Sequence, residues 1–108
     1  MYLFLCSCPE ERAPALAEAL VEEQLAACVH LLPTGTSIYR WEGELCRDRE
    51  VTLLLKVSAE QTEAARARLL ELHPYEVPEI IALSVDEARS FKGYLQWVQE
   101  SSRAPAGS

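Results

Sequence analysis

Residues 73–80, HPYEVPEI, gather several side chains that could do chemistry. They include one of only two histidines, two of six prolines and two carboxylates. Each proline fixes its own φ and disfavours helix at the residue before it, so we predict a stiff, extended connection from a helix into a strand. Glu76 and Glu79 could offer paired oxygens, or could be solvated or paired with arginine. His73 could bind a metal ion, or could stabilise the end of the preceding helix.

Four cysteines are the other candidate ligands. Cys6 and Cys8 stand two apart on an apolar predicted strand, so they share one side and could be ligands or small hydrophobic core residues. Cys28 follows two alanines and is expected in the core, whereas Cys46 is expected to be exposed near a hairpin tip. No C-x-x-C pair is present, which disfavours a zinc ribbon or a thioredoxin-type centre. We expect reduced thiols.

Lys56 could supply the positive charge of an anion-binding pocket, or could form a salt bridge with Glu50 or Glu79. His30, on the second predicted strand, is expected at an edge or an interface. Aromatic residues could line a cleft between subunits together with Lys56 and Glu76, or could simply pack in an interface. These aromatic residues are Tyr39, Trp41, Tyr75 and Trp97.

The sequence gives little support for an enzyme. No arrangement of a Ser-His-Asp or Cys-His type is suggested beyond the presence of the residue types. The four glycines, at positions 35, 43, 93 and 107, make no loop that could cradle a phosphate. We therefore predict a protein that is not an enzyme.

Charge and hydropathy limit the partners. The 108 residues carry 10 basic and 17 acidic side chains, a net charge of −7, and contain no basic run. Nucleic acid is therefore not an expected partner, because phosphate backbones bind to clusters of lysine and arginine. No apolar run is long enough to span a membrane, and residues 1–8 lack the positive region of a signal peptide. We expect a cytoplasmic protein without a membrane partner.

These candidates must be positioned by the elements that hydrophobic periodicity predicts. Ser58 and Gln61 have the spacing of a capping box that opens the second helix, and that helix should end at His73. Strands are predicted at 2–7, 27–32 with a resumption at 36–41, 51–57 and 79–85. Helices are predicted at 10–25, between Ser58 and His73, and around an apolar stripe formed by Phe91, Tyr94, Leu95 and Val98.

This order predicts an α+β fold of the ferredoxin-like βαββαβ type, with two helices on one face of an antiparallel sheet and an extra C-terminal helix. Residues 1–100 should form one domain, and residues 101–108 should fray. The second face of the sheet and the long hairpin around Glu42 and Gly43 are left uncovered. Uncovered faces and edges favour association, so we expect a homo-oligomer.

Four stretches of the chain together resemble the CutA family of divalent-cation tolerance proteins. They are residues 25–29 (LAACV), 37–43 (SIYRWEG), 73–80 (HPYEVPEI) and 94–97 (YLQW). They occur in order at the family's spacing, and the resemblance spans roughly residues 3–98. It implies a ferredoxin-like subunit in a homotrimer whose long hairpins pack between neighbours.

The resemblance also implies a role in tolerance of divalent cations, copper above all. It places proposed metal ligands at Cys6 and His73, and Cys8 or Glu79 could assist. The chain departs from the family pattern at Leu72, where some members carry a second histidine. Two alternatives stay open: a trimeric small-molecule sensor like the PII signalling proteins, and a purely structural trimer.

Overall fold

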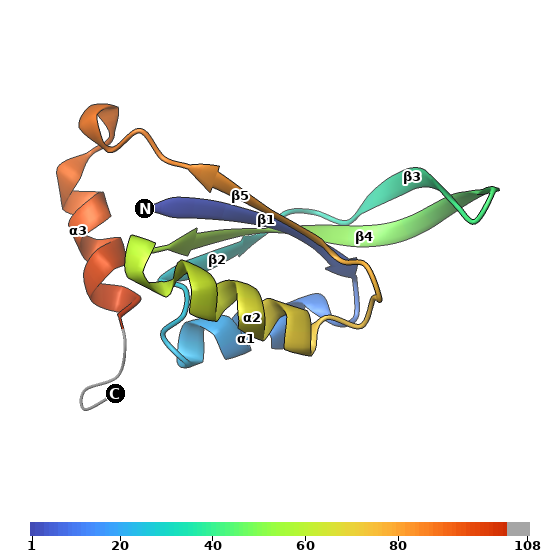
Figure 1. The fold of residues 1–108 in the computed structure, drawn as a ribbon, viewed down its shortest axis with the longest axis horizontal. Helices are drawn as coiled ribbons and strands as arrows, with labels where there is room; N and C mark the ends of the chain where they lie inside the picture. The colour runs from blue at the N-terminus through green and yellow to red at the C-terminus, as the bar shows by residue number, and fades with distance from the viewer. Residues whose placement is uncertain (104–108) are drawn as a thin grey trace.

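The computed structural model describes residues 1–103 as five strands and three helices in the predicted order (Figure 1). The strands are β1 (Tyr2–Pro9), β2 (Cys28–Leu31), β3 (Gly35–Trp41), β4 (Glu44–Val57) and β5 (Glu79–Ser84). The helices are α1 (Ala13–Glu22), α2 (Thr62–Leu72) and α3 (Lys92–Ser101), with short 3₁₀ turns at Ala59–Gln61 and Glu87–Arg89. The predicted α+β class and the extra C-terminal helix are confirmed.

The strands form one antiparallel sheet in the order β2-β4-β1-β5, and β3 pairs with the remaining length of β4. Strand β4 is therefore shared by three partners. It begins at Glu44, earlier than the predicted start at Val51, because the hairpin continues its pairing from Trp41 opposite Glu44 to Gly35 opposite Glu50. The ferredoxin-like arrangement follows from this order.

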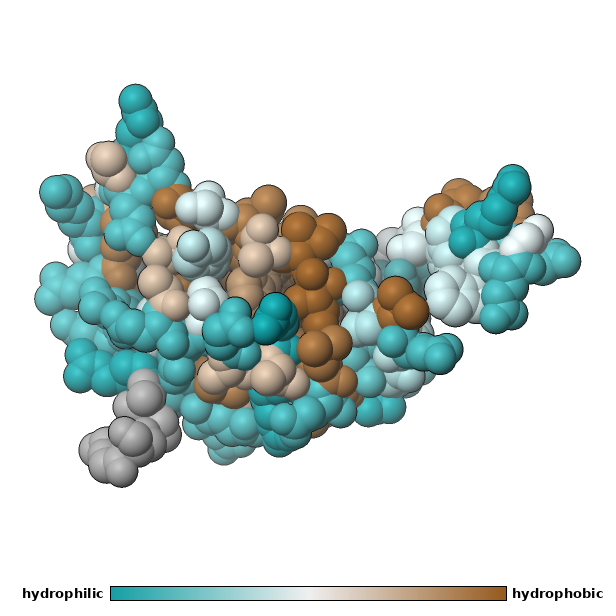
Figure 2. Space-filling view, in the orientation of Figure 1, coloured by the Kyte–Doolittle hydropathy of each residue, from teal (hydrophilic) through white to brown (hydrophobic). Residues whose placement is uncertain are grey.

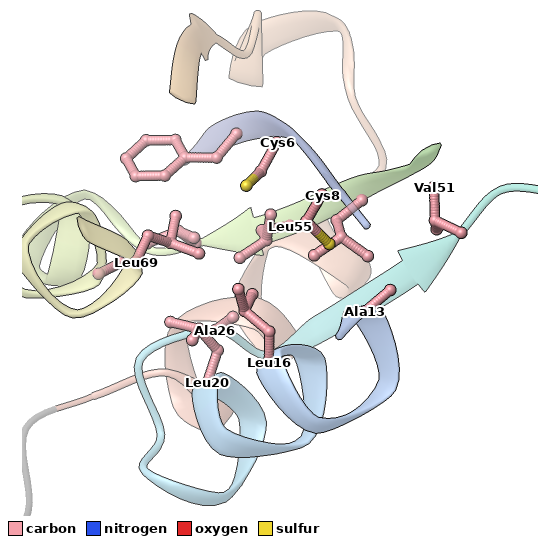
Figure 3. Close-up of a cluster of buried hydrophobic side chains, with 13 residues drawn as sticks. Cys6, Cys8, Ala13, Leu16, Leu20, Ala26, Val51, Leu55 and Leu69 are labelled. Carbon is pink, nitrogen blue, oxygen red and sulfur yellow. The ribbon is translucent and has the colours of Figure 1, made fainter. Parts of the chain in front are cut away.

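Alternate residues of β1 and β4 form the core beneath α1 and α2. The inward face of β4 consists of alternate residues, since Val51, Leu53, Leu55 and Val57 are all buried. Phe4, Cys6 and Cys8 of β1 face the same side. Figure 3 shows both thiols among the apolar side chains of the strands and helices. Burial of these side chains is what holds the helices to the sheet.

Helix α1 is shorter than predicted. Pro9 continues β1 opposite Glu50, and its carbonyl accepts a hydrogen bond from the N–H of Arg12 at 3.0 Å. The chain therefore turns before the helix starts, and Pro14 rather than Pro9 lies in its first turn. At the other end Gln24 adopts φ 61°, which stops the helix before the predicted residue 25.

The predicted capping box is wrong. The hydroxyl of Ser58 donates to the carbonyl of Ser102, and the side-chain Nε2 of Gln61 donates to the carbonyl of Gln24 at 3.2 Å. Both side chains form hydrogen bonds with residues distant in the sequence and are not used as helix caps. A 3₁₀ turn therefore leads into α2 without a side-chain cap. The end of α2 is as predicted, because His73 already has extended geometry, with ψ 135°.

The C-terminal helix departs from expectation in two ways. Of its predicted stripe only Val98 is fully buried, while Phe91 precedes the helix and is 80% exposed. Fraying was expected from Ser101, but Ser101 ends α3 and Ser102 is fully buried. The rest of the expected tail, residues 104–108, lies outside the described residues. The division into a domain at 1–100 and a tail stays a prediction.

Two features of the molecule remain uncovered. The β3–β4 hairpin, which turns through Glu42 and Gly43 with φ values of 50° and 82°, projects well beyond the other strands (Figure 1). The sheet side opposite α1 and α2 carries alternate apolar residues that we call the outer face: Leu3, Leu5, Leu54, Ile81 and Leu83. Figure 2 shows hydrophobic surface over the middle of the body and again on the hairpin. No helix in residues 1–103 is long and apolar enough to cross a membrane.

Candidate functional site

A groove of about 650 Å³ lies at the base of the projecting hairpin. Strands β1, β3, β4 and β5 and the 73–80 connection all contribute to its wall. We call it the hairpin groove, lined by Ser7, Ser37, Ile38, Tyr39, Trp41, Glu50, Tyr75, Glu76, Val77 and Glu79. The cross-strand register explains the gathering, because Glu79 pairs with Ser7 and Glu50 pairs with Gly35 beside the hairpin residues.

Two phenols in the groove donate to carboxylates. The hydroxyl of Tyr75 donates to Glu50 at 2.7 Å, and burial together with this bond raises the pKa of Tyr75 above its usual value. The hydroxyl of Tyr39 donates to Asp48, and this hydrogen bond raises the pKa of Tyr39 to about 12. Both phenols therefore stay protonated at neutral pH and orient their partner carboxylates.

The hairpin groove is acidic. Three glutamates line it, no lysine or arginine does, and none of the three forms an ion pair with a described residue. Glu79 accepts a hydrogen bond from the hydroxyl of Ser7 at 3.0 Å, and Glu50 accepts the one from Tyr75. Carboxylates gathered in a concave surface attract cations and can supply oxygen ligands to them.

His73 has both ring nitrogens occupied. Its Nδ1 accepts a hydrogen bond from the backbone N–H of Tyr75 at 3.1 Å, so its Nε2 carries the proton and donates to the carbonyl of Ser7 at 2.7 Å. The ring is 7% exposed and lies 4.9 Å from the ring of Tyr75. His73 therefore ties the proline-flanked connection to β1.

Cys6 and Cys8 lie in the core on the side of the sheet that faces the helices. Burial is the main cause that raises the pKa of Cys6 to about 12 and that of Cys8 to about 11. Both sulfurs are therefore thiols rather than thiolates at neutral pH, and the thiolate is the metal ligand.

The four residues proposed as a metal site are not brought together in this chain. Glu79 pairs with Ser7 and so lies on the side of the sheet opposite Cys6 and Cys8, and the nitrogens of His73 already have partners. Within residues 1–103 no group of three or more His, Cys, Asp or Glu residues is arranged to hold a metal ion. The Cys6–His73 set does not fit a metal ion in this arrangement.

The expected cleft residues separate into two groups. Tyr39, Trp41, Tyr75 and Glu76 line the hairpin groove. Trp97 does not, and its ring packs against Tyr94 at 5.6 Å on α3.

Lys56 also lies outside the groove, where its Nζ is 3.8 Å from Sγ of Cys28. Of the two alternatives for Lys56, the salt bridge with Glu50 or Glu79 is not formed among residues 1–103. The expected burial of Cys28 in the core is wrong, because Cys28 is half-buried on β2. His30 is exposed on the edge strand β2, as predicted.

Sequence reasoning missed five residues of the lining, namely Ser7, Ser37, Ile38, Glu50 and Val77. A usable signal existed for Glu50. If the two-residue turn at Glu42 and Gly43 is extended backward as a continuous hairpin, residue 50 falls opposite residue 35. The sequence suggested no such continuation through the charged residues 47–50.

Comparison with known proteins gives independent evidence for the family of this chain. Residues 2–101 match the family described as CutA1 divalent ion tolerance protein. The Divalent-cation tolerance protein CutA of Thermus thermophilus is 48% identical over 92 residues, which are 85% of this chain and 87% of that protein.

Solved structures give the same result. The structure of the PII-like protein CutA from Nostoc sp. PCC 7120 in apo form matches with a TM-score of 0.93 at 40% identity, covering 97% of this chain and 100% of that one. The structure of the periplasmic divalent cation tolerance protein CutA from Archaeoglobus fulgidus matches with a TM-score of 0.87 at 28% identity, covering 95% of this chain and 100% of that one.

Proposed function

The chain belongs to the CutA1 divalent ion tolerance protein family and is not an enzyme, and on this basis we propose that it supports tolerance of divalent cations as a homotrimer that binds the cation reversibly. Copper is the cation we expect first. The observation that carries the proposal is the acidic hairpin groove, which holds three glutamates and no basic side chain. Its oxygen donors suit a divalent cation bound weakly enough to be released.

The ligands we propose are the carboxylates of Glu50, Glu76 and Glu79. The pair implied by family resemblance, Cys6 and His73, would require the loss of both imidazole hydrogen bonds and the exposure of a thiol that is fully buried. The groove carboxylates need no such rearrangement. Because the single chain holds no cluster of three ligands in residues 1–103, a neighbouring subunit would have to close the site.

The trimer is supported by what the single chain leaves uncovered. Ile81 and Leu83 of the outer face are 46% and 44% exposed, and the hairpin projects with Ile38 and Leu45 57% and 64% exposed. Side chains of this size gain about 1.5–3 kcal/mol each from complete burial. Packing against other copies would provide that burial.

Calorimetric titration of the reduced protein with Cu²⁺ and Zn²⁺ tests the ligand assignment. We expect Glu76→Gln and Glu79→Gln each to weaken saturable binding about tenfold, the loss of one charged ligand being worth at least 1.4 kcal/mol. Cys6→Ser, the matched control, should bind as the wild type does.

Loss of binding in Cys6→Ser with normal binding in both glutamine variants would instead support the ligands implied by resemblance. No binding by any variant or by the wild type would make the metal link indirect and would favour the purely structural trimer.

A small-molecule sensor is the second candidate, because the related Nostoc protein is described as PII-like. A sensor of that kind would need a long loop between the hairpin strands, and here the turn is only Glu42 and Gly43. Saturable nucleotide binding in the same calorimetric assay would revive this candidate.

We also propose that the protein acts in the cytoplasm without a nucleic-acid or membrane partner. The net charge of −7 argues against a nucleic-acid partner. The relative from Archaeoglobus fulgidus is described as periplasmic, so fractionation of the native host cells is the deciding measurement. Recovery in a periplasmic fraction would contradict the proposal.

A further inference from the structure

A second groove lies between α1 and the edge strand β2. It measures about 560 Å³, and we call it the helix groove, lined by Pro14, Ala17, Glu18, Val21, Glu22, Val29 and Leu31. Val29 and Leu31 pair with Leu55 and Leu53, which are buried beneath the helices. The helix groove therefore opens on the side of the sheet opposite the outer face. Its wall is mainly apolar, and its charged side chains are both acidic.

The two glutamates of the helix groove lie side by side. Glu18 and Glu22 are exposed and stand four residues apart on α1, a spacing that puts the Cβ atoms of a helix about 5–6 Å apart. Neither forms an ion pair with any of residues 1–103. The helix groove is thus suited to an apolar partner that carries two neighbouring positive charges.

The β3–β4 hairpin carries a surface of that chemistry. We call it the arginine face, formed by Ile38 opposite Arg47 and Arg40 opposite Leu45. All four side chains are exposed, although Ile38 also borders the hairpin groove. Neither arginine forms an ion pair within the described part of the chain. The two arginines are diagonal neighbours on adjacent strands, about 7–8 Å apart, so their long side chains can reach two adjacent carboxylates.

The arginine face is turned to the same side of the sheet as the helices. Arg49, the next residue of β4 on that side, forms an ion pair with Glu10, which precedes α1, at 3.3 Å. The hairpin does not bring the arginine face to the helix groove of its own chain, because the continuous β3–β4 ladder extends away from the body (Figure 1). A second copy of the chain can supply what each surface lacks.

We propose that the helix groove of one copy receives the arginine face of the next copy. Ile38 and Leu45 enter the apolar part of the groove, and the two arginines form ion pairs with the two glutamates. This pairing of surfaces rests on the proposed homotrimer. A ring of three copies needs a contact between two different surfaces, since a self-complementary contact closes after two copies. The outer face lies on the other side of the sheet, so both contacts can form in one trimer.

Carbodiimide cross-linking of full-length Arg47→Lys provides the test. The substitution keeps the positive charge and supplies an amine, which carbodiimide joins to a touching carboxylate with loss of water. We expect covalent dimers and trimers on a denaturing gel. In these species peptide 13–40, which contains Glu18 and Glu22, should be linked to peptide 41–49, because trypsin does not cleave after a modified lysine. Fragmentation of the linked peptides locates the carboxylate.

Two further variants serve as controls. Arg89→Lys places the same amine at an exposed position in the turn before α3, and it should give no link to Glu18 or Glu22. Addition of Glu18→Gln and Glu22→Gln to Arg47→Lys should remove the linked pair of peptides. If the pair persists in that triple variant, or if Arg89→Lys links to the same glutamates, the proposal is overturned.

Light scattering of the same samples separates this contact from the trimer itself. If Arg47→Lys is trimeric but gives no linked pair, or gives it only within single chains, the contact between hairpin and helix groove is overturned and the proposed trimer stands. If the wild type is monomeric, both are overturned. A linked pair found between chains of a trimer supports both.

Discussion

The imidazole of His73 joins two stretches of chain that lie 66 residues apart, through its hydrogen bonds to the carbonyl of Ser7 and the amide of Tyr75. With both nitrogens engaged, the ring fixes where the proline-flanked connection meets β1. The same connection carries Tyr75 and Glu76 to the hairpin groove. The contribution of His73 to the groove is therefore to position it.

We expect His73→Ala to lower the free energy of unfolding by about 2–3 kcal/mol, because a buried carbonyl and a partly buried N–H lose their partner. Urea denaturation measures this loss. Glu60→Ala, an exposed change near the start of α2, should alter the same quantity by less than about 0.5 kcal/mol. Equal stability of the two variants would contradict a structural role for His73.

The buried thiols predict an alkaline loss of stability. Folding raises the pKa of Cys6 from 9.0 to about 12, so the folded state holds this proton more tightly than the unfolded state does. The resulting stabilisation is complete below pH 9.0 and is lost as the pH rises toward 12. We expect Cys6→Ala to show a shallower decline of the unfolding free energy between these limits, measured by urea denaturation at each pH.

A core truncation without a thiol separates this effect from the cost of a cavity. Leu16→Ala should be less stable than the wild type at every pH but should decline with the wild-type slope. Tyr39 contributes to the decline in all variants, because its pKa is raised as well. An unchanged slope in Cys6→Ala would show that the thiol does not carry the effect.

At the scale of elements, α3 is fastened to the body through one buried pair of serines. The hydroxyl of Ser102 accepts a hydrogen bond from the backbone N–H of Ser58 at 3.1 Å and donates to the carbonyl of Val98 at 2.7 Å. The hydroxyl of Ser58 in turn donates to the carbonyl of Ser102. The end of the last helix is thereby joined to the turn that precedes α2.

We expect Ser102→Ala to destabilise the protein by about 1–3 kcal/mol, since it leaves the buried N–H of Ser58 without its acceptor. The neighbouring Ser101→Ala is the matched control and should cost less than about 0.5 kcal/mol. Thermal unfolding of both variants provides the comparison. A larger loss for Ser101 would contradict this account of the anchor.

The elements that depend on local pattern could be predicted, and those that depend on distant partners could not. Hydrophobic periodicity correctly predicted a strand over 51–57, and the proline after His73 correctly predicted the end of α2. The hydroxyl of Ser58 was assigned to a cap because its true partner, Ser102, is 44 residues away. Cys28 was placed in the core because its side of β2 depends on the register with Lys56.

At the scale of the whole molecule, the uncovered outer face predicts the assembly. Ile81→Glu should place a charge in the proposed contact between subunits and should shift the particle mass from three times the 12.1 kDa chain toward one. Light scattering after size-exclusion chromatography measures that mass. Leu70→Glu, at a similarly exposed position on α2, should leave it unchanged. A wild-type monomer at micromolar concentration would overturn the trimer.

The candidate site was predicted only in part, because it depends both on local sequence composition and on pairing between distant strands. Residues 73–80 and the aromatic residues of the hairpin were identifiable from local composition, and six of them line the groove. Cys6 lies in the core and Glu79 lines the groove because they face opposite sides of the sheet. That sidedness is set by pairing between strands far apart in the chain.

The central position of β1 also has a consequence for how the protein is made. Its two neighbours are β4 and β5, so Tyr2 pairs with Val57 on one side and with Ser84 on the other. During synthesis β1 therefore waits for β4 and β5, which follow it far along the chain, before both of its edges are filled. Such non-local pairing is slow, and it exposes an apolar strand while synthesis continues. Of the strands of this sheet, β1 is thus the one that stays unpaired longest during synthesis.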